Sequence, residues 1–222
     1  DYLYEQFDTE FEEAFAQGGF ILLGWAEVGF VHMFTNSPIN KPDDLKRIKL
    51  WTWEGDPVAE AAFRALGISP IPVAFTDVMT SLQTGLIDAF YTPPYAAITL
   101  QWHTRAKYMV ETPISDAAGA VLLAKSYYDK LPPDLQEIVI RNGRIHLSRL
   151  TNLAREDNRK AIDILRKAGL VIQKVDEKEL PLYFEAGRRA RRMLVGKLYS
   201  EEFLNHVEQA VEAFRKNNRT AQ

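Results

Sequence analysis

The side chains best suited to chemistry in this sequence form no recognisable catalytic pattern. Its histidines (His32, His103, His146 and His206) are scattered, without an i, i+4 pair or a nearby carboxylate cluster. A zinc site needs convergent ligands, so no metal site is expected. The chain also lacks a Gly-x-Ser-x-Gly elbow, a phosphate loop and a Gly-x-Gly-x-x-Gly turn. We therefore expect no catalytic residues, no metal and no cofactor.

Two acid–base pairs keep an enzyme open as an alternative. Asp88 with His103, or Glu54 with Asp56, could supply a general acid and a general base. Each carboxylate also has a simpler structural role. Asp56 precedes Pro57 and reads as a helix N-cap, while Asp88 lies where it can support a turn.

Aromatic side chains at strand ends and in loops give the strongest signal for a binding site. Trp51 and Trp53 stand where a short strand from Ile48 ends, and ligands of α/β domains bind at strand ends. Aromatic rings offer a large contact area at a low entropic cost and dominate apolar pockets. About half of the wider aromatic set, which includes Phe90 and Trp102, is expected to be core. The candidate pocket wall contains Trp25, Trp51, Trp53, Phe75, Tyr91 and Tyr95.

The helices and strands that position these side chains can be predicted from the periodicity of hydrophobic residues and from the places where glycine and proline interrupt it. The β-α-β-α-β order from Ile48 to Tyr91 predicts a parallel, right-handed α/β unit. Residues 133–168 contain no proline after Pro133 and predict a helix long enough to bridge two lobes. We expect helices at 2–17, 57–66, 77–84, 95–104, 133–168, 177–195 and 200–217, and strands at 20–25, 29–35, 48–53, 70–73, 86–91, 107–112, 118–124 and 169–172.

Composition excludes several classes of protein. The 222 residues carry a net charge of −3 and have a sequence pI near 5.9, which does not fit a basic nucleic-acid binder. There are no cysteines, so disulfides and thiolate chemistry are excluded. No apolar run approaches the ~20 residues that cross a bilayer. The chain begins at Asp1 inside an amphipathic pattern, and we expect a longer precursor.

Several motifs in order resemble the solute-binding proteins of tripartite ATP-independent periplasmic (TRAP) transporters. The resemblance covers about residues 3–217, and the order and spacing of the motifs are more specific than any one of them. The motifs are Pro42-x-Asp44-Leu45-Lys46-x-Ile48-Lys49, Ala65-Leu66-Gly67, Phe75, Leu82-Gln83-Thr84-Gly85, Ile87-Asp88, Pro93 and Lys107-Tyr108.

The resemblance implies an α/β, two-lobed periplasmic-binding-protein fold of the type II-like class, with a long crossover helix, that closes on a solute. By this mapping residues 1–28 and 117–156 are the remainder of a first lobe truncated at its N-terminus. Residues 29–116 form the parallel α/β second lobe, and residues 157–222 are C-terminal helices that pack mainly on it. An incomplete lobe exposes apolar surface, so we expect a partner chain or a swapped homodimer.

The departures from the family pattern concern the ligand. The family strand ends in Lys-x-Arg, and that arginine clamps a solute carboxylate, but here Lys49-Leu50-Trp51 places tryptophan at its position. A second family arginine is replaced by Val31, and the asparagine before the family proline is Thr92. These residues join the candidate ligand site and predict an apolar, amphipathic or uncharged ligand. The alternative places Trp51 in the core and uses Arg47, Lys49 or Arg105 as the clamp.

The resemblance implies a non-enzymatic, periplasmic receptor that delivers its solute to membrane permease subunits. A missing N-terminus would carry any membrane anchor. A helical-repeat, TPR-like partner protein is also expected, and no nucleic-acid partner. The alternatives are a small-molecule enzyme and a ligand sensor on the same scaffold. The basic run Arg188–Arg192 is either a solvated face paired to glutamates or a docking patch for an acidic surface.

Overall fold

A computed structural model describes residues 1–219 and divides the chain into two compact units. Unit 1 contains residues 1–27, 118–153 and the described residues from 196 on; unit 2 contains Val28–Ala117 and Ala154–Val195. The helices are α1 (Tyr2–Gln6), α2 (Asp8–Gln17), α3 (Pro57–Ala65), α4 (Val78–Thr84), α5 (Pro94–Thr99), α6 (Lys125–Tyr128), α7 (Pro133–Lys167), α8 (Leu180–Met193) and α9 (Glu201–Arg219). The 3-10 helices are η1 (Pro42–Arg47), η2 (Phe75–Asp77), η3 (Trp102–Arg105) and η4 (Glu177–Glu179). The strands are β1 (Phe20–Thr35), β2 (Trp51–Trp53), β3 (Ile71–Val73), β4 (Ala89–Thr92), β5 (Tyr108–Val110), β6 (Ser115–Ala124) and β7 (Val171–Gln173).

Local sequence signals fix the ends of several helices. The Asp56 side chain accepts hydrogen bonds from two backbone N–H groups of the first turn of α3, and Pro57 occupies the first helical position. Gly85 ends α4 in the left-handed conformation, at φ 74°. The predicted long helix is confirmed as α7, which has 35 residues.

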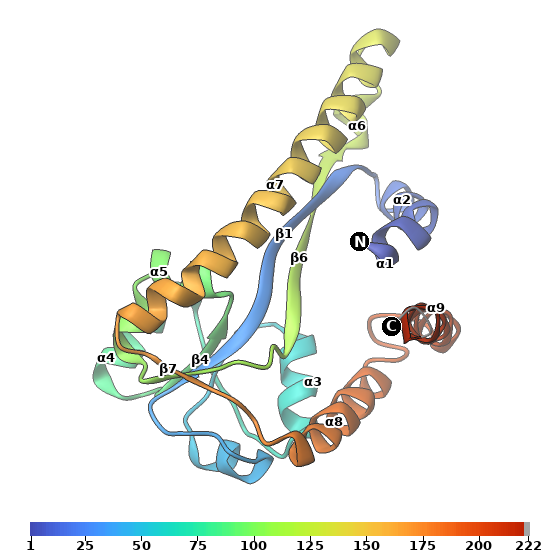
Figure 1. The fold of residues 1–222 in the computed structure, drawn as a ribbon. Helices are drawn as coiled ribbons and strands as arrows, with labels where there is room; N and C mark the ends of the chain where they lie inside the picture. Colours follow the sequence, from blue (N-terminus) through green and yellow to red (C-terminus); the bar gives the residue numbers. More distant parts are fainter. Residues whose placement is uncertain (220–222) are drawn as a thin grey trace. The chain divides into compact units, whose positions relative to one another are not determined.

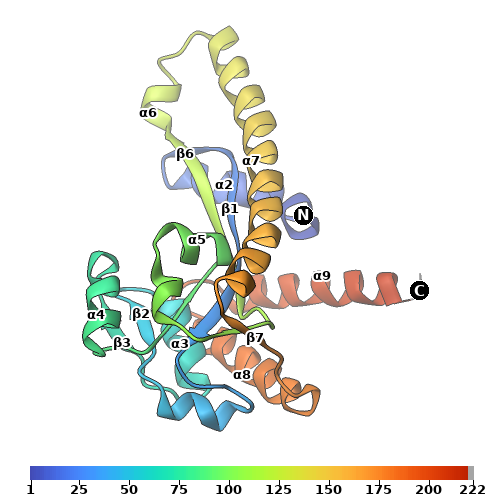
Figure 2. The ribbon, with the colours of Figure 1, turned by 60° about the vertical axis from the view of Figure 1, so that its left-hand side comes forward.

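Two sheets organise the strands. The larger has the order β4-β1-β5-β7, with β6 also paired to β1, and β4 runs antiparallel to β1. The smaller consists of β2 and β3 in parallel register, and it lies beside α4 (Figure 2). The parallel unit predicted over Ile48–Tyr91 is thus present in β2 and β3, but its last strand, β4, pairs mainly with β1. Only a single parallel bridge, Leu50 to Ala89, joins β4 to the stretch before β2.

Strand β1 corrects the prediction of two separate strands at 20–25 and 29–35. It is continuous over 16 residues because Gly24 and Gly29 adopt φ values of +148° and +125°, which side chains rarely tolerate. The predicted helix at 2–17 is likewise two helices, α1 and α2, separated at the buried Phe7.

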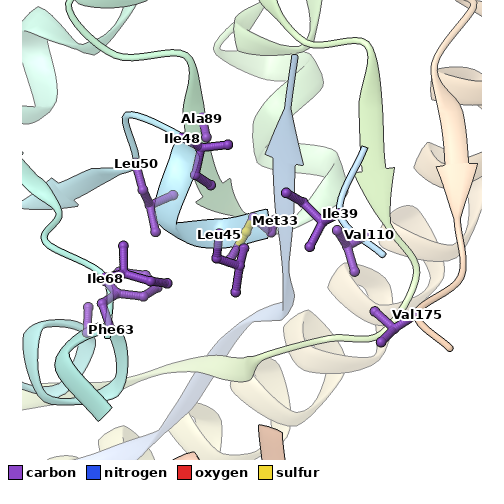
Figure 3. Close-up of a cluster of buried hydrophobic side chains, with 11 residues drawn as sticks. Met33, Ile39, Leu45, Ile48, Leu50, Phe63, Ile68, Ala89, Val110 and Val175 are labelled. Atoms are coloured by element: carbon purple, nitrogen blue, oxygen red, sulfur yellow. The ribbon is translucent and has the colours of Figure 1, made fainter. Parts of the chain in front are cut away.

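Unit 2 holds two clusters of buried apolar side chains. The first core cluster includes Met33, Leu45, Phe63 and Val110, and Figure 3 shows its members. Helices α3 and α8 pack side by side over it (Figure 1). The second core cluster includes Phe34, Trp51, Phe90 and Trp102. Of the C-terminal helices, α8 belongs to unit 2 and α9 to unit 1.

Candidate functional site

An aromatic cluster lies at the end of β2, and it contains most of the aromatic side chains that the sequence selected. Phe75 begins η2 and Trp102 begins η3, and both rings lie against the β2 side chains. The centroid of the Phe75 ring is 5.2 Å from that of Trp102, and the Trp51 centroid is 5.3 Å from Trp102. We define the aromatic cluster as Trp51, Trp53, Phe75, Phe90, Tyr91 and Trp102.

Trp51 forms the floor of this cluster. It is only 3% exposed, and its indole N–H donates to the Val73 carbonyl over 3.0 Å. Its ring stacks on Tyr91 with a centroid separation of 5.2 Å. The position where the family pattern has arginine therefore holds a packed and hydrogen-bonded indole.

The upper side of the aromatic cluster is open to solvent. Trp53 is 53% exposed and Phe75 is 40% exposed, and their ring centroids are 5.5 Å apart. Two adjacent exposed rings over a buried indole make an apolar surface that a flat or aliphatic molecule can cover. This surface is the candidate ligand-binding site.

Tyr91 joins the aromatic cluster to the turn before α3. Its hydroxyl donates to the Asp56 carboxylate over 3.3 Å and accepts from the Trp53 backbone N–H over 3.4 Å. Burial is the main cause that raises the pKa of Tyr91, so its hydroxyl stays protonated at neutral pH. Tyr91 therefore contributes a neutral group to the site.

Val31 and Thr92 are buried and lie on opposite faces of the larger sheet. Thr92 pairs with His32, and Tyr91 pairs with Met33, across β1 and β4. Cross-strand partners share a face and neighbours along a strand alternate, so Val31 shares the face of Tyr91 and Thr92 does not. The structure thus brings Trp51, Trp53, Phe75 and Tyr91 together, whereas Thr92 lies on the opposite face of β4 from Tyr91, the face that it shares with Phe90.

Tyr95 is positioned by a residue that the sequence gave no reason to select. Its backbone N–H donates to Asn158 of α7 over 3.0 Å, and its side chain is 50% exposed. The Asn158 amide also donates to the carbonyls of Val28 and Ala154. Asn158 therefore ties β1, α5 and α7 together, through contacts between residues as many as 130 positions apart.

Trp25, the remaining aromatic candidate, lies in unit 1. Its ring stacks on Tyr4 at 4.7 Å and makes an edge contact with Phe11 at 5.0 Å. It packs with the N-terminal helices and is not a member of the aromatic cluster.

Three of the four acid–base candidates have structural partners. Asp88 accepts the Lys49 backbone N–H over 2.7 Å, and the His103 ring hydrogen-bonds the Ala97 carbonyl over 3.0 Å. Asp56 caps α3, as predicted. These engagements give each side chain a role in the fold.

The alternative cations lie at the surface of the chain. Lys49, Arg47 and Arg105 are all exposed, and the Lys49 ammonium donates to the Gly85 carbonyl over 3.0 Å. In the basic run, Arg188 pairs with Glu185 at 2.6 Å, and Arg189 donates to the Ala65 carbonyl.

Within residues 1–219 no group of three or more His, Asp or Glu side chains could hold a metal ion. No helix in the same residues is long and apolar enough to cross a membrane.

A family profile decides what kind of protein this is. Residues 2–197 match the profile of the bacterial extracellular solute-binding proteins, family 7. The chain belongs to this family. The resemblance to TRAP transporter solute-binding proteins is thereby confirmed, and solved structures with a similar fold are also TRAP solute-binding proteins.

The relatives of this family-7 chain include two that are more than 30% identical to it. A "Solute-binding protein" of Verminephrobacter eiseniae is 34% identical over 161 residues, which is 72% of this chain and 48% of the relative. The 2,3-diketo-L-gulonate-binding periplasmic protein YiaO of Escherichia coli is 32% identical over 158 residues, which is 70% of this chain and 46% of the relative. The chain thus spans about half the length of these curated relatives.

Solved structures show the same fold. A TRAP periplasmic solute-binding protein of Ralstonia eutropha with bound (S)-2-acetolactate superimposes with a TM-score of 0.84, at 20% identity, over 96% of this chain and 69% of that one. An open, ligand-free TRAP solute-binding protein of Rhodobacter sphaeroides gives 0.77, at 24% identity, over 91% and 66%. The predicted two-lobed α/β class is therefore confirmed as a fold.

Proposed function

We propose that this chain is part of a periplasmic TRAP receptor that captures an uncharged, apolar or amphipathic solute on the aromatic cluster and delivers it to a membrane permease. Membership of a solute-binding family supports binding without chemical turnover. The proposed class of ligand rests on the packing of Trp51. Its buried indole occupies the position at which the family pattern has arginine.

The energetic argument concerns what Trp51 and its neighbours can offer a ligand. A carboxylate buried against these rings without a guanidinium partner loses its hydration and gains no ion pair, which costs several kcal/mol. An apolar molecule that covers Trp53 and Phe75 instead removes exposed ring surface from water, worth roughly 25 cal/mol per Å². The aromatic cluster therefore favours uncharged ligands over carboxylates.

The names of relatives do not fix the ligand of this chain. They include a C4-dicarboxylate-binding protein of Rhodobacter capsulatus and an ectoine/5-hydroxyectoine-binding protein of Ruegeria pomeroyi. The family thus accommodates anionic and zwitterionic solutes on one scaffold. Delivery to a permease, the helical-repeat partner and the homodimer stay predictions, as does the assignment of residues 29–116 to a second lobe.

The proposal is tested by titrating the protein with succinate and, separately, with neutral naphthalene while tryptophan fluorescence is recorded. We expect naphthalene to change the emission of the aromatic cluster and succinate to leave it unchanged. Phe75→Ala should weaken the naphthalene response, whereas Leu182→Ala, which changes an exposed side chain of α8 outside the aromatic cluster, should retain it. Tight succinate binding, or a naphthalene response that Phe75→Ala leaves unchanged, would refute the proposed ligand class.

A further inference from the structure

A second apolar site lies between α3 and α8 in unit 2. It is a groove of 380 Å³, within the roughly 300–1,000 Å³ typical of small-molecule pockets. Side chains of the first core cluster, among them Met33, Leu45, Phe63 and Val110, line it (Figure 3). We call this site the α3–α8 groove.

The rim of the α3–α8 groove leaves apolar side chains in water. Phe184 of α8 is 60% exposed and Val58 of α3 is 54% exposed, and both line the groove. Ala62 and Gly187 also line it, and their small size keeps the space between the helices open. A molecule seated there would shield the rim from water, which is the usual driving force for an apolar pocket.

The charges around the α3–α8 groove indicate which ligands it can accept. The Tyr183 ring lines the groove, and its hydroxyl is buried with no hydrogen-bond partner among the described residues. Burial, and then the nearby carboxylates of Asp44 and Glu179, raise the pKa of Tyr183 to about 12. Asp56 and Arg191, one carboxylate and one cation, also line the groove and oppose each other in charge. The further carboxylates of Asp44 and Glu179 near Tyr183 repel an anion at this wall, and the protonated hydroxyl can donate to an acceptor.

We propose that the α3–α8 groove binds an uncharged, mainly apolar small molecule with one hydrogen-bond acceptor, to which the Tyr183 hydroxyl donates a hydrogen bond once that side chain has rotated toward the ligand. The groove therefore adds a binding site to the aromatic cluster. The two sites are neighbours, because the Tyr91 ring contacts Phe63 of the groove on one side and Trp51 of the aromatic cluster on the other, each at 5.2 Å.

The test uses the neutral dye Prodan, whose naphthalene body is apolar and whose ketone is an acceptor, and follows its fluorescence during titration of the 222-residue chain. Phe184→Ala removes a rim ring and should weaken binding in the groove about tenfold. Tyr183→Phe should weaken it about two- to tenfold, the effect of one hydrogen bond. Leu182→Ala is the matched control, because Leu182 is an exposed α8 side chain (54%) that does not line the groove.

Ala62→Phe fills the groove from α3 and should abolish its Prodan binding, and circular dichroism checks that the variant folds. If Ala62→Phe does not fold, the effect of Phe184→Ala, which changes an exposed side chain, still tests whether the groove binds Prodan. If both sites bind dye, the stoichiometry is two; Ala62→Phe lowers it to one, Phe184→Ala weakens one of the two affinities and Phe75→Ala weakens the other. If the aromatic cluster does not bind, the stoichiometry is one, and only the groove variants weaken or abolish dye binding. Dye binding that Phe184→Ala and Tyr183→Phe leave unchanged, or no dye binding at all, would overturn the groove proposal.

Discussion

Replacing Trp51 by alanine measures whether this side chain is the structural floor of the aromatic cluster. The indole is 3% exposed and lies 5.2 Å from the Tyr91 ring and 5.3 Å from the Trp102 ring. Its removal deletes these contacts and also leaves the Val73 carbonyl without its indole donor. Truncations of buried tryptophan cost about 3–5 kcal/mol, and the lost hydrogen bond places Trp51→Ala in the upper part of that range.

The assay is urea unfolding followed by far-ultraviolet circular dichroism, because removing a tryptophan alters the fluorescence signal itself. With a slope of about 1–3 kcal/mol per molar urea, the unfolding midpoint of unit 2 should fall by at least about 1 M. Trp53→Ala is the matched control two residues away. That side chain is 53% exposed, and its loss should cost about 1 kcal/mol or less.

A Trp51→Ala midpoint no lower than that of Trp53→Ala would refute the reasoning. It would mean that Trp51 contributes no more packing energy than an exposed ring. The assignment of Trp51 to a buried floor, and of Trp53 and Phe75 to the open surface, would then be wrong.

Three further predictions concern the surroundings of the site. Gly29→Ala should destabilise unit 2 by about 2 kcal/mol or more, because φ is +125° and a Cβ would collide with the Asn158 amide nitrogen. A melting temperature equal to wild type would contradict this. Asp56→Ala should cost about 1 kcal/mol in chemical denaturation through the lost α3 cap, whereas Glu60→Ala in the same helix should cost less. Burial lowers the pKa of His32 below the ordinary 6.5, so protonation favours the unfolded chain. Its contribution to stability should therefore be full above pH ~6.5 and decline as the pH falls below that value, and His32→Gln should flatten this part of the profile.

The elements that local sequence signals define could be predicted. Asp56 and Pro57 mark the start of α3, and the proline-free stretch after Pro133 gives α7, because caps and helix-breaking residues act within a few positions. The grouping of Trp51, Trp53 and Phe75 was also predictable in outline. Aromatic residues at neighbouring strand and turn ends of an α/β unit converge on the same edge.

Features that depend on distant parts of the chain could not be predicted. The sequence does not distinguish a core tryptophan from a pocket wall, and Trp51 is fixed by a carbonyl 22 residues away. Asn158 forms hydrogen bonds with the backbone of Tyr95, 63 positions away, and with that of Val28, 130 positions away. No local motif in the sequence predicts such contacts. Gly29, predicted as the first residue of a second strand, instead lies inside the single strand β1 and lets it pass close to Asn158.

Strand β3 also limits which molecules can associate beside the aromatic cluster. Its Ile71 N–H points toward β2 and donates to the Leu50 carbonyl over 2.8 Å, so the next residue, Pro72, faces the outer edge. Proline has no N–H, and an incoming peptide strand finds no donor at the centre of this edge. The same two prolines that keep β3 short, Pro70 and Pro72, thus protect the sheet from edge-to-edge aggregation and leave the exposed rings of Trp53 and Phe75 to small molecules.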